Sequence, residues 1–213
     1  MPMYKHSDRG PVVHLDRSAK GLMIRAIIED SLGKTMSGLD VLDVGCGNGG
    51  ISEVLADDGN QVWGVDVEDK RSDGFPTHFE VVDSERLPFV DNKFDVVVSH
   101  HVIEHVEDQL LHLRELRRVL RPNGTAYMAT PNRTSPIMSG HVGNEMVLRW
   151  PEMAPLFEEA GFAVDDYGWR VLTDPKHFHF SPDFGRFLPG GVARALRRWF
   201  PSHMFILSPQ KDG

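Results

Sequence analysis

Cysteine and long apolar runs are scarce in this chain of 213 residues. The single cysteine, Cys46, excludes an intramolecular disulfide and fits a reducing compartment. No stretch approaches the ~18 uncharged apolar residues of a membrane span, and the N-terminus has no apolar segment of the kind found in signal peptides. We therefore expect a soluble, cytoplasmic chain without a membrane partner.

Basic residues are also fewer than acidic residues. The chain has 23 lysine and arginine residues against 31 aspartate and glutamate residues, and its formal net charge is −8. Because this excess of negative charge repels a phosphate backbone, a long nucleic acid is not expected as a partner. The length suits one well-buried α/β core and is short for two full domains.

Glycine, in contrast, is concentrated at one place. Residues 41–50 read Val-Leu-Asp-Val-Gly-Cys-Gly-Asn-Gly-Gly, an apolar strand pattern that contains Asp43 and runs into four glycines. Glycine allows positive φ and leaves room for a ligand where a Cβ would collide. A strand that ends in such a loop, ahead of a helix, is predicted to hold a small molecule.

A second apolar strand pattern, residues 61–66, ends on Asp66, which follows Gly45 by 21 residues. At this distance a βαβ unit places a carboxylate beside the ribose hydroxyls of a nucleoside ligand. Gly45, Gly47 and Gly50 also satisfy the G-x-G-x-x-G fingerprint of dinucleotide-binding dehydrogenases. Two classes of nucleoside-binding protein are therefore considered.

Asp43 favours one of these two classes. A pyrophosphate binds backbone N–H groups at a helix N-terminus, so a carboxylate two residues before the first glycine disfavours it. The same carboxylate suits a ligand with a cationic amine and no phosphate, such as the methionine part of S-adenosylmethionine. At this point the chain resembles the class I S-adenosylmethionine-dependent methyltransferases, whose first motif is similar to residues 41–49. An NAD-binding dehydrogenase domain remains a remote alternative.

The resemblance implies S-adenosylmethionine as cofactor and S-adenosylhomocysteine as product. It implies that the glycines shape a loop under the methionine part, that Asp43 orients the loop and the ammonium group, and that Asp66 accepts the ribose hydroxyls. It further implies that Asp83 and Ser84 frame the adenine. The full set of expected cofactor-binding residues is Asp43, Gly45, Cys46, Gly47, Gly49, Asp66, Val67, Asp83, Ser84 and His100.

Further strand and helix patterns follow in the order that this family uses. They consist of β-branched runs and of apolar residues spaced at a helical period. Strands are expected over 79–83, 94–99, 125–129, 162–169 and 204–207, and helices over 106–120 and 151–160. The expected fold is α/β: a Rossmann-like, doubly wound, mostly parallel sheet of seven strands in a single domain.

Segments outside the cofactor core are left to bind the substrate. Residues 1–38 contain an expected helix over 16–32 and are predicted to form an N-terminal cover over the ligand edge. Residues 39–213 are the expected methyltransferase domain, with a turn-rich stretch at 130–148. Because the last two strands of this family often form a near-direct hairpin, the residues at about 170–201 are predicted to be an insertion for substrate recognition or dimer contacts.

Three titratable residues follow the fourth expected strand. His101, Glu104 and His105 spell H-x-x-E-H, which on a long helix binds Zn²⁺ with the glutamate as base. A zinc hydrolase is a remote alternative, because the preceding residues are strand-like and the glycine loop would have no role. Methyltransferases similar to this chain carry a Val/Leu-Glu-His-Val string here, at the edge where methyl donor and acceptor meet.

Three roles are open for these residues. In some relatives, including ubiquinone-pathway and small-RNA terminal ribose O-methyltransferases, a Glu-x-x-Glu-His string binds a divalent metal. This chain has His101 in place of the first glutamate, and a metal held by His101, Glu104 and His105 is an alternative that we do not favour. We favour metal-free catalysis, in which His101 or His105 takes the acceptor proton as general base. Glu104 and His105 could also simply begin the following helix.

The resemblance implies in-line SN2 transfer of a methyl group from the sulfonium to a small-molecule acceptor, through oxygen or nitrogen. The acidic charge and the cover segments with aromatic and histidine residues suggest a small neutral or cationic acceptor. A non-catalytic partner subunit that only binds cofactor is the remaining alternative. The glycines and the ribose acid are both present, which favours an enzyme.

Overall fold

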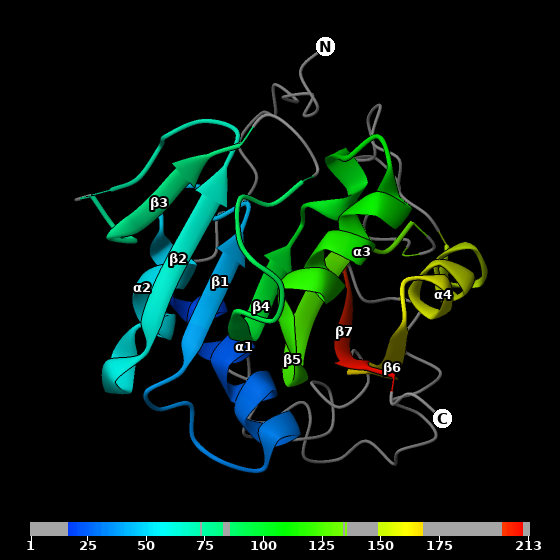
Figure 1. The fold of residues 1–213 in the computed structure, drawn as a ribbon, viewed down its shortest axis with the longest axis horizontal. Coiled ribbons are helices and arrows are strands. Elements are labelled where there is room, and N and C mark those ends of the chain that lie inside the picture. Colours follow the sequence, from blue (N-terminus) through cyan, green and yellow to red (C-terminus); the bar gives the residue numbers. More distant parts are fainter. Residues whose placement is uncertain are drawn as a thin grey trace.

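The computed structural model describes residues 17–72, 74–82, 86–133, 135, 149–167 and 202–210. Within these ranges, seven strands form one sheet with helices on both faces (Figure 1). The strands are β1 Asp40–Val44, β2 Gln61–Asp66, β3 His78–Val81, β4 Phe94–His100, β5 Leu120–Pro131, β6 Phe162–Asp166 and β7 Ser202–Pro209. The predicted seven-stranded α/β fold is confirmed.

The strand order is β3-β2-β1-β4-β5-β7-β6. Strands β1 to β5 run parallel, whereas β7 is antiparallel to both β5 and β6. The order reverses between β1 and β4, so the carboxyl ends of these strands flank the switch point of the sheet. Ligands of doubly wound sheets bind at this point.

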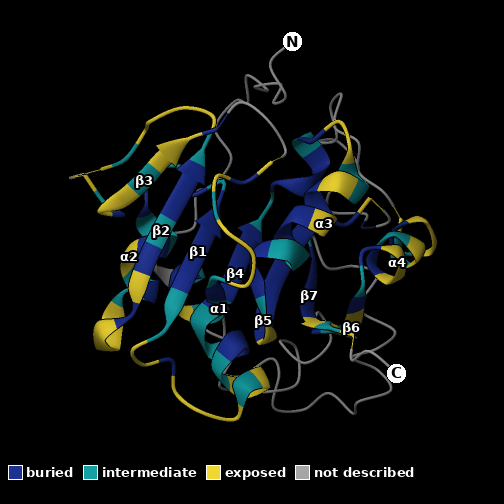
Figure 2. Cartoon of the chain, viewed as in Figure 1, coloured by how far each residue is buried: buried dark blue, intermediate teal, exposed yellow. Residues whose placement is uncertain are grey.

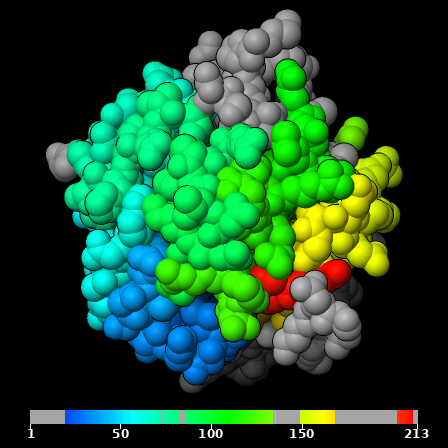
Figure 3. Space-filling model, viewed as in Figure 1, coloured from blue at the N-terminus to red at the C-terminus, as the bar shows by residue number. Residues whose placement is uncertain are grey.

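Among the described residues, four α-helices cover the sheet: α1 Arg17–Leu32, α2 Gly50–Leu55, α3 Gln109–Val119 and α4 Trp150–Glu159. The apolar residues of α1 and α2 share one core with Val41 and Tyr127, and those of α3 and α4 share the other with Leu42 and Phe205. The central strands are consequently buried on both faces (Figure 2), which explains their near-continuous apolar sequences. In the space-filling view, α3 and the loop before β4 form the middle of one face, with α4 beside them (Figure 3).

Helix α3 begins later than its apolar period predicts. Residues Ile103–His105 form a separate 3-10 turn, and Asp108 caps α3 by accepting a hydrogen bond from the Leu111 N–H at 2.9 Å. Strand β5 begins earlier than predicted, because Leu120 already pairs with Phe94 of β4. Over the described ranges, no helix is both long enough and apolar enough to cross a bilayer.

The N-terminal helix α1 packs on one face of the sheet, where its isoleucines are fully buried. The predicted cover over the ligand edge by residues 1–38 stays a prediction. Tyr167, just after β6, donates a hydrogen bond to Asp30 of α1 at 2.9 Å. Residues 1–16 and 170–201 lie outside the described residues, so the insertion between β6 and β7 and the division after residue 38 stay predictions.

Candidate functional site

The glycine loop begins where β1 ends, beside the end of β4. Gly45, Gly47 and Gly49 have φ values of 71°, 56° and 85°. A Cβ on Gly45 would collide with the Val102 side chain, and a Cβ on Gly49 would collide with the Phe75 carbonyl. The backbone therefore requires glycine at these positions, and the loop packs directly against the residues that follow β4.

Asp66 lies at the end of β2, next to this loop. Its Oδ2 accepts a hydrogen bond from the Gly47 N–H at 2.8 Å, and its Oδ1 accepts one from the Val67 N–H at 2.7 Å. The carboxylate thus joins the glycine loop to the second strand. Each carboxylate oxygen has a second lone pair, so both can still accept a ligand hydroxyl.

Asp43 is 1% exposed, within the sheet. Its Oδ2 accepts a hydrogen bond from the Ser52 hydroxyl at 2.5 Å, and Ser52 belongs to the short helix α2 that follows the loop. Asp43 therefore fixes α2 against β1 and so orients the loop between them. Its predicted contact with a cofactor ammonium group stays a prediction.

Cys46 is a buried thiol inside the loop. Burial, assisted by the negative charges of Asp43 and Asp66, raises the pKa of the Cys46 thiol far above its usual range. A protonated, buried thiol is a poor nucleophile. Cys46 therefore acts as a small packing residue beside the site.

The remaining predicted cofactor residues are only partly placed. Asp83 and Ser84 lie outside the described residues. Val67 is 38% exposed beside Asp66. His100 is the last residue of β4, and its ring stacks on Tyr127 at a centroid distance of 6.1 Å. His100 thus lies at the carboxyl edge of the sheet, close to the glycine loop.

His101 and Glu104 form a hydrogen-bonded pair just beyond β4. The His101 Nδ1 lies 3.1 Å from Glu104 Oε1, and the Thr130 hydroxyl donates to Glu104 Oε2 at 3.2 Å. Glu104 is buried, so both of its oxygens are satisfied inside the protein. His101 has a φ of 59°, which few residues other than glycine adopt, and its N–H donates to the Ala129 carbonyl at 2.9 Å.

The second ring nitrogen of His101 contacts Ser202. Its Nε2 lies 3.1 Å from the Ser202 hydroxyl oxygen, and the His101 side chain is 32% exposed. Ser202 is the first residue of β7 and pairs with Pro131 at the end of β5. The sequence analysis missed Ser202 and Thr130, because no local pattern connects either residue with His101.

His112 of α3 is a buried histidine nearby. Its Nε2 lies 3.3 Å from the Ser99 hydroxyl oxygen. Burial lowers the pKa of His112 to about 4, although the charge of Glu104 acts in the opposite direction. His112 is therefore neutral at pH 7. The sequence analysis missed it, since a polar residue within an apolar period carries no sign of its burial.

The H-x-x-E-H residues do not lie on one helix. His101 follows a strand and Glu104 lies in a 3-10 turn, so the motif is not on a long helix. Across the part of the chain that the structure describes, no three His, Cys, Asp or Glu side chains are grouped to hold a metal ion. Both oxygens of Glu104 already accept hydrogen bonds. The metal site of His101, Glu104 and His105 stays an untested alternative. The zinc-hydrolase alternative loses support, because its motif requires a long helix.

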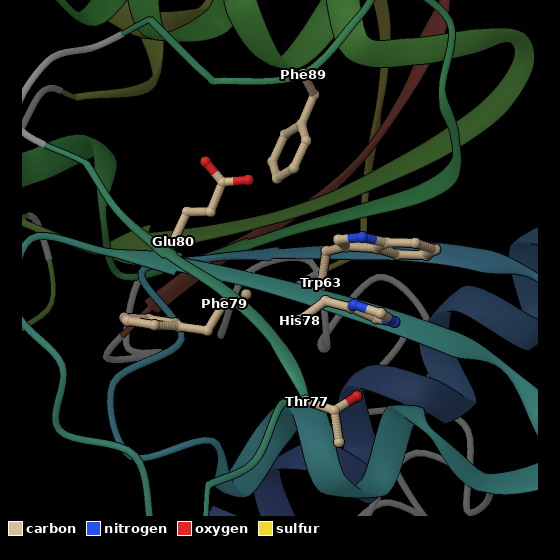
Figure 4. Close-up of a pocket in the computed structure, with 7 residues that line it drawn as sticks. Trp63, Thr77, His78, Phe79, Glu80 and Phe89 are labelled. Carbon is tan, nitrogen blue, oxygen red and sulfur yellow. The ribbon is translucent and has the colours of Figure 1, made fainter.

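A cavity of about 260 Å³ opens over β2 and β3 (Figure 4). Trp63 and His78 stack there at 4.9 Å, and the Lys93 ammonium lies 4.4 Å from the Trp63 ring centroid. The lining residues are Trp63, Gly64, Thr77, His78, Phe79, Glu80 and Phe89. None of them belongs to the predicted site, so this cavity is distinct from the glycine loop.

Known methyltransferases are similar in sequence to this chain, and the matched region contains the glycine loop. A family model described as a methyltransferase domain matches residues 42–128. The ubiquinone biosynthesis O-methyltransferase of Rhizobium rhizogenes is 35% identical over 127 residues, which cover 55% of this chain and 51% of that protein. A Mycolicibacterium smegmatis protein named "Probable S-adenosylmethionine-dependent methyltransferase" is 34% identical over 152 residues, covering 66% and 58%. The chain thus spans little more than half the length of these relatives.

A solved structure has the same fold. Phosphoethanolamine N-methyltransferase 2 of Haemonchus contortus, in complex with S-adenosyl-L-methionine, matches with a TM-score of 0.61 at 20% identity, covering 88% of this chain and 52% of that chain. The sheet topology and the glycine loop define a Rossmann-like nucleoside-binding protein. Residues 42–128 therefore form a methyltransferase domain, and the chain is similar to S-adenosylmethionine-dependent methyltransferases.

Proposed function

We propose that this chain transfers a methyl group from S-adenosylmethionine to oxygen or nitrogen of a small-molecule acceptor, with His101 as general base. The observation that carries the proposal is the His101–Glu104 pair at the carboxyl edge of the sheet. Val102, which directly follows His101, packs against Gly45 of the glycine loop. The proposed base and the proposed donor site therefore come from adjacent loops.

The donor side of the proposal uses the residues around the glycine loop. Asp66 would accept the ribose hydroxyls with the lone pairs that its two backbone contacts leave free. The tight glycine loop would carry the methionine part, and Asp43 would act through α2. Because the sulfonium is already activated, the enzyme gains mostly by holding nucleophile and methyl group in line.

His101 suits the role of general base better than His105. Its ring is partly exposed, and the buried Glu104 carboxylate would stabilise an imidazolium as it forms. An imidazole is well matched to proton transfer near neutral pH. His105 ends the 3-10 turn, and its N–H donates to the Val102 carbonyl at 2.8 Å.

The proposed class of acceptor rests on the net charge of the chain and on the names of two similar proteins. The formal charge of −8 favours a neutral or cationic acceptor over an anionic polymer. The Rhizobium rhizogenes relative is named as an O-methyltransferase, and the Haemonchus contortus structure is named as an N-methyltransferase. We also propose a cytoplasmic location, which the single buried thiol supports.

The test combines cofactor binding with turnover. Isothermal titration with S-adenosylhomocysteine measures the donor site, and mass spectrometry measures methylation of catechol and of benzylamine as hydroxyl and amine probes. His101→Asn keeps a residue that tolerates positive φ, so it should bind cofactor normally yet lose about 10²- to 10⁴-fold in kcat. His105→Asn is the matched control, with kcat within about threefold of wild type. Binding without methylation of either probe would contradict the proposal.

A further inference from the structure

Ser202 is a polar residue at the proposed site that the methyl-transfer scheme has not used. Its hydroxyl oxygen lies 3.1 Å from His101 Nε2, although the two residues are far apart in the chain. Strand β7 runs antiparallel to β5, so its first residue lies at the carboxyl edge of the sheet, opposite Pro131. Ser202 is therefore fixed by a strand at the edge where donor and acceptor meet.

The hydrogen bonds around His101 determine what the Ser202 hydroxyl does. In the proposed relay Glu104 is the carboxylate acceptor, so Nδ1 of His101 carries the proton and donates to it. Nε2 of the neutral ring is then an acceptor, and Ser202 donates its single hydroxyl proton to it. The two lone pairs of the Ser202 oxygen stay available to accept a hydrogen bond from a substrate.

The resulting chain of hydroxyl, imidazole and carboxylate has the order found in serine hydrolases. In those enzymes the serine attacks an electrophile supplied by the substrate. Here the electrophile of the proposed reaction is the sulfonium methyl group, and the nucleophile must be the acceptor. The hydroxyl next to the imidazole is then placed to pass on a proton.

We propose that Ser202 relays the acceptor proton to His101 and that the acceptor is a hydroxyl compound; this rests on the proposed methyl transfer. The acceptor O–H proton moves to the Ser202 oxygen while the Ser202 proton moves to His101 Nε2. The acceptor oxygen bonds to the methyl carbon, and the carbon–sulfur bond breaks with its electron pair on sulfur. The products are a methyl ether, S-adenosylhomocysteine and an imidazolium paired with Glu104.

A hydroxyl acceptor needs such a relay more than an amine does. A neutral amine attacks through its lone pair and can lose its proton after the methyl group has moved. A hydroxyl is a weak nucleophile until its proton leaves, so a base in contact with it accelerates the methyl-transfer step itself. The relay therefore favours oxygen over nitrogen as the methylated atom.

Threonine and valine at position 202 form the sharpest test. Both side chains are β-branched, suit a strand and have similar shapes, but only threonine keeps the hydroxyl. With catechol as probe, Ser202→Thr should stay within about threefold of wild type in kcat, and Ser202→Val should lose about tenfold or more, with KM for S-adenosylmethionine unchanged. Ser208→Ala, at an exposed position of the same strand, should match wild type.

A second measurement reports the protons directly. The kcat for catechol is measured in mixtures of H₂O and D₂O: a relay of two protons gives a curved dependence on deuterium content, and Ser202→Ala should give a shallower, linear one. Benzylamine turnover by Ser202→Val should fall by less than about twofold.

The outcomes separate the two proposals. Equal kcat for Ser202→Thr and Ser202→Val would overturn the relay while leaving His101 as base. Wild-type methylation of benzylamine but not of catechol would overturn the hydroxyl acceptor. Methylation of neither probe by an enzyme that binds S-adenosylhomocysteine would overturn the proposed function, and the relay with it.

Discussion

Replacement of His112 by glutamine should remove much of the acid sensitivity of folding. Burial lowers the pKa of His112 to about 4 from its ordinary value of 6.5. Between these values the unfolded chain binds a proton at this position and the folded chain does not. The free energy of unfolding therefore falls as pH falls through this window. Glutamine does not titrate, is a good helix former and can hydrogen-bond to Ser99.

The size of the effect follows from the pKa difference. At 1.36 kcal/mol per pH unit, His112 should contribute a loss of about 2.5 kcal/mol between pH 7.5 and pH 4.5, and at most about 3.4 kcal/mol at lower pH. All of this stabilisation is present above pH 6.5. A loss of this size is a substantial fraction of the 5–15 kcal/mol typical of folded domains.

Urea unfolding followed by circular dichroism measures this loss in wild type and in His112→Gln at pH 7.5 and pH 4.5. The variant should lose about 2.5 kcal/mol less than wild type over this range. His78→Gln is the control, because His78 is exposed and its replacement should leave the pH dependence unchanged. Parallel pH profiles for wild type and His112→Gln would refute the reasoning.

Three further predictions concern the site. Asp66→Ala should weaken S-adenosylhomocysteine binding by about 2–4 kcal/mol in a calorimetric titration, because both proposed ribose contacts and the bond to Gly47 are lost; an unchanged Kd would remove Asp66 from the proposed donor site. Cys46 should resist iodoacetamide at pH 8 in the folded chain and react in urea, and rapid labelling of the folded chain would show an accessible thiol. Glu104→Gln should lower kcat by about 10² or more with cofactor binding intact, since an amide cannot stabilise an imidazolium, and full activity would contradict the pairing.

The geometry around the glycine loop was predictable because its signals are local. The glycines between β1 and α2 need positive φ, and Asp66 follows at the distance set by one βαβ unit. Parallel strands place their carboxyl ends at one edge, so the meeting of Asp66 with Gly47 follows from topology. Asp43 lies in β1 just before the loop, and its bond to Ser52 required the structure.

The acceptor half was less predictable because its contacts are set by tertiary structure. The H-x-x-E-H pattern is typical of a helix, because histidines four residues apart lie on the same face of a helix. The positive φ of His101 ends the strand and aims the ring at Glu104 and Ser202 instead. The amphipathic pattern of α1 predicted a helix correctly, but it does not encode which surface the helix covers.

The strand order reverses between β1 and β4. As a result, donor binding and acceptor proton transfer are proposed for separate stretches of the chain. The glycine loop and Asp66, which are proposed to hold the methyl donor, follow β1 and end β2, whereas His101 and Ser202, which are proposed to handle the acceptor proton, follow β4 and begin β7. We therefore expect substitutions on the β4 side of the switch point to alter acceptor chemistry without replacing the residues proposed to bind the nucleoside. An engineer could vary positions 130 and 202 to change acceptor preference while the donor site is kept constant.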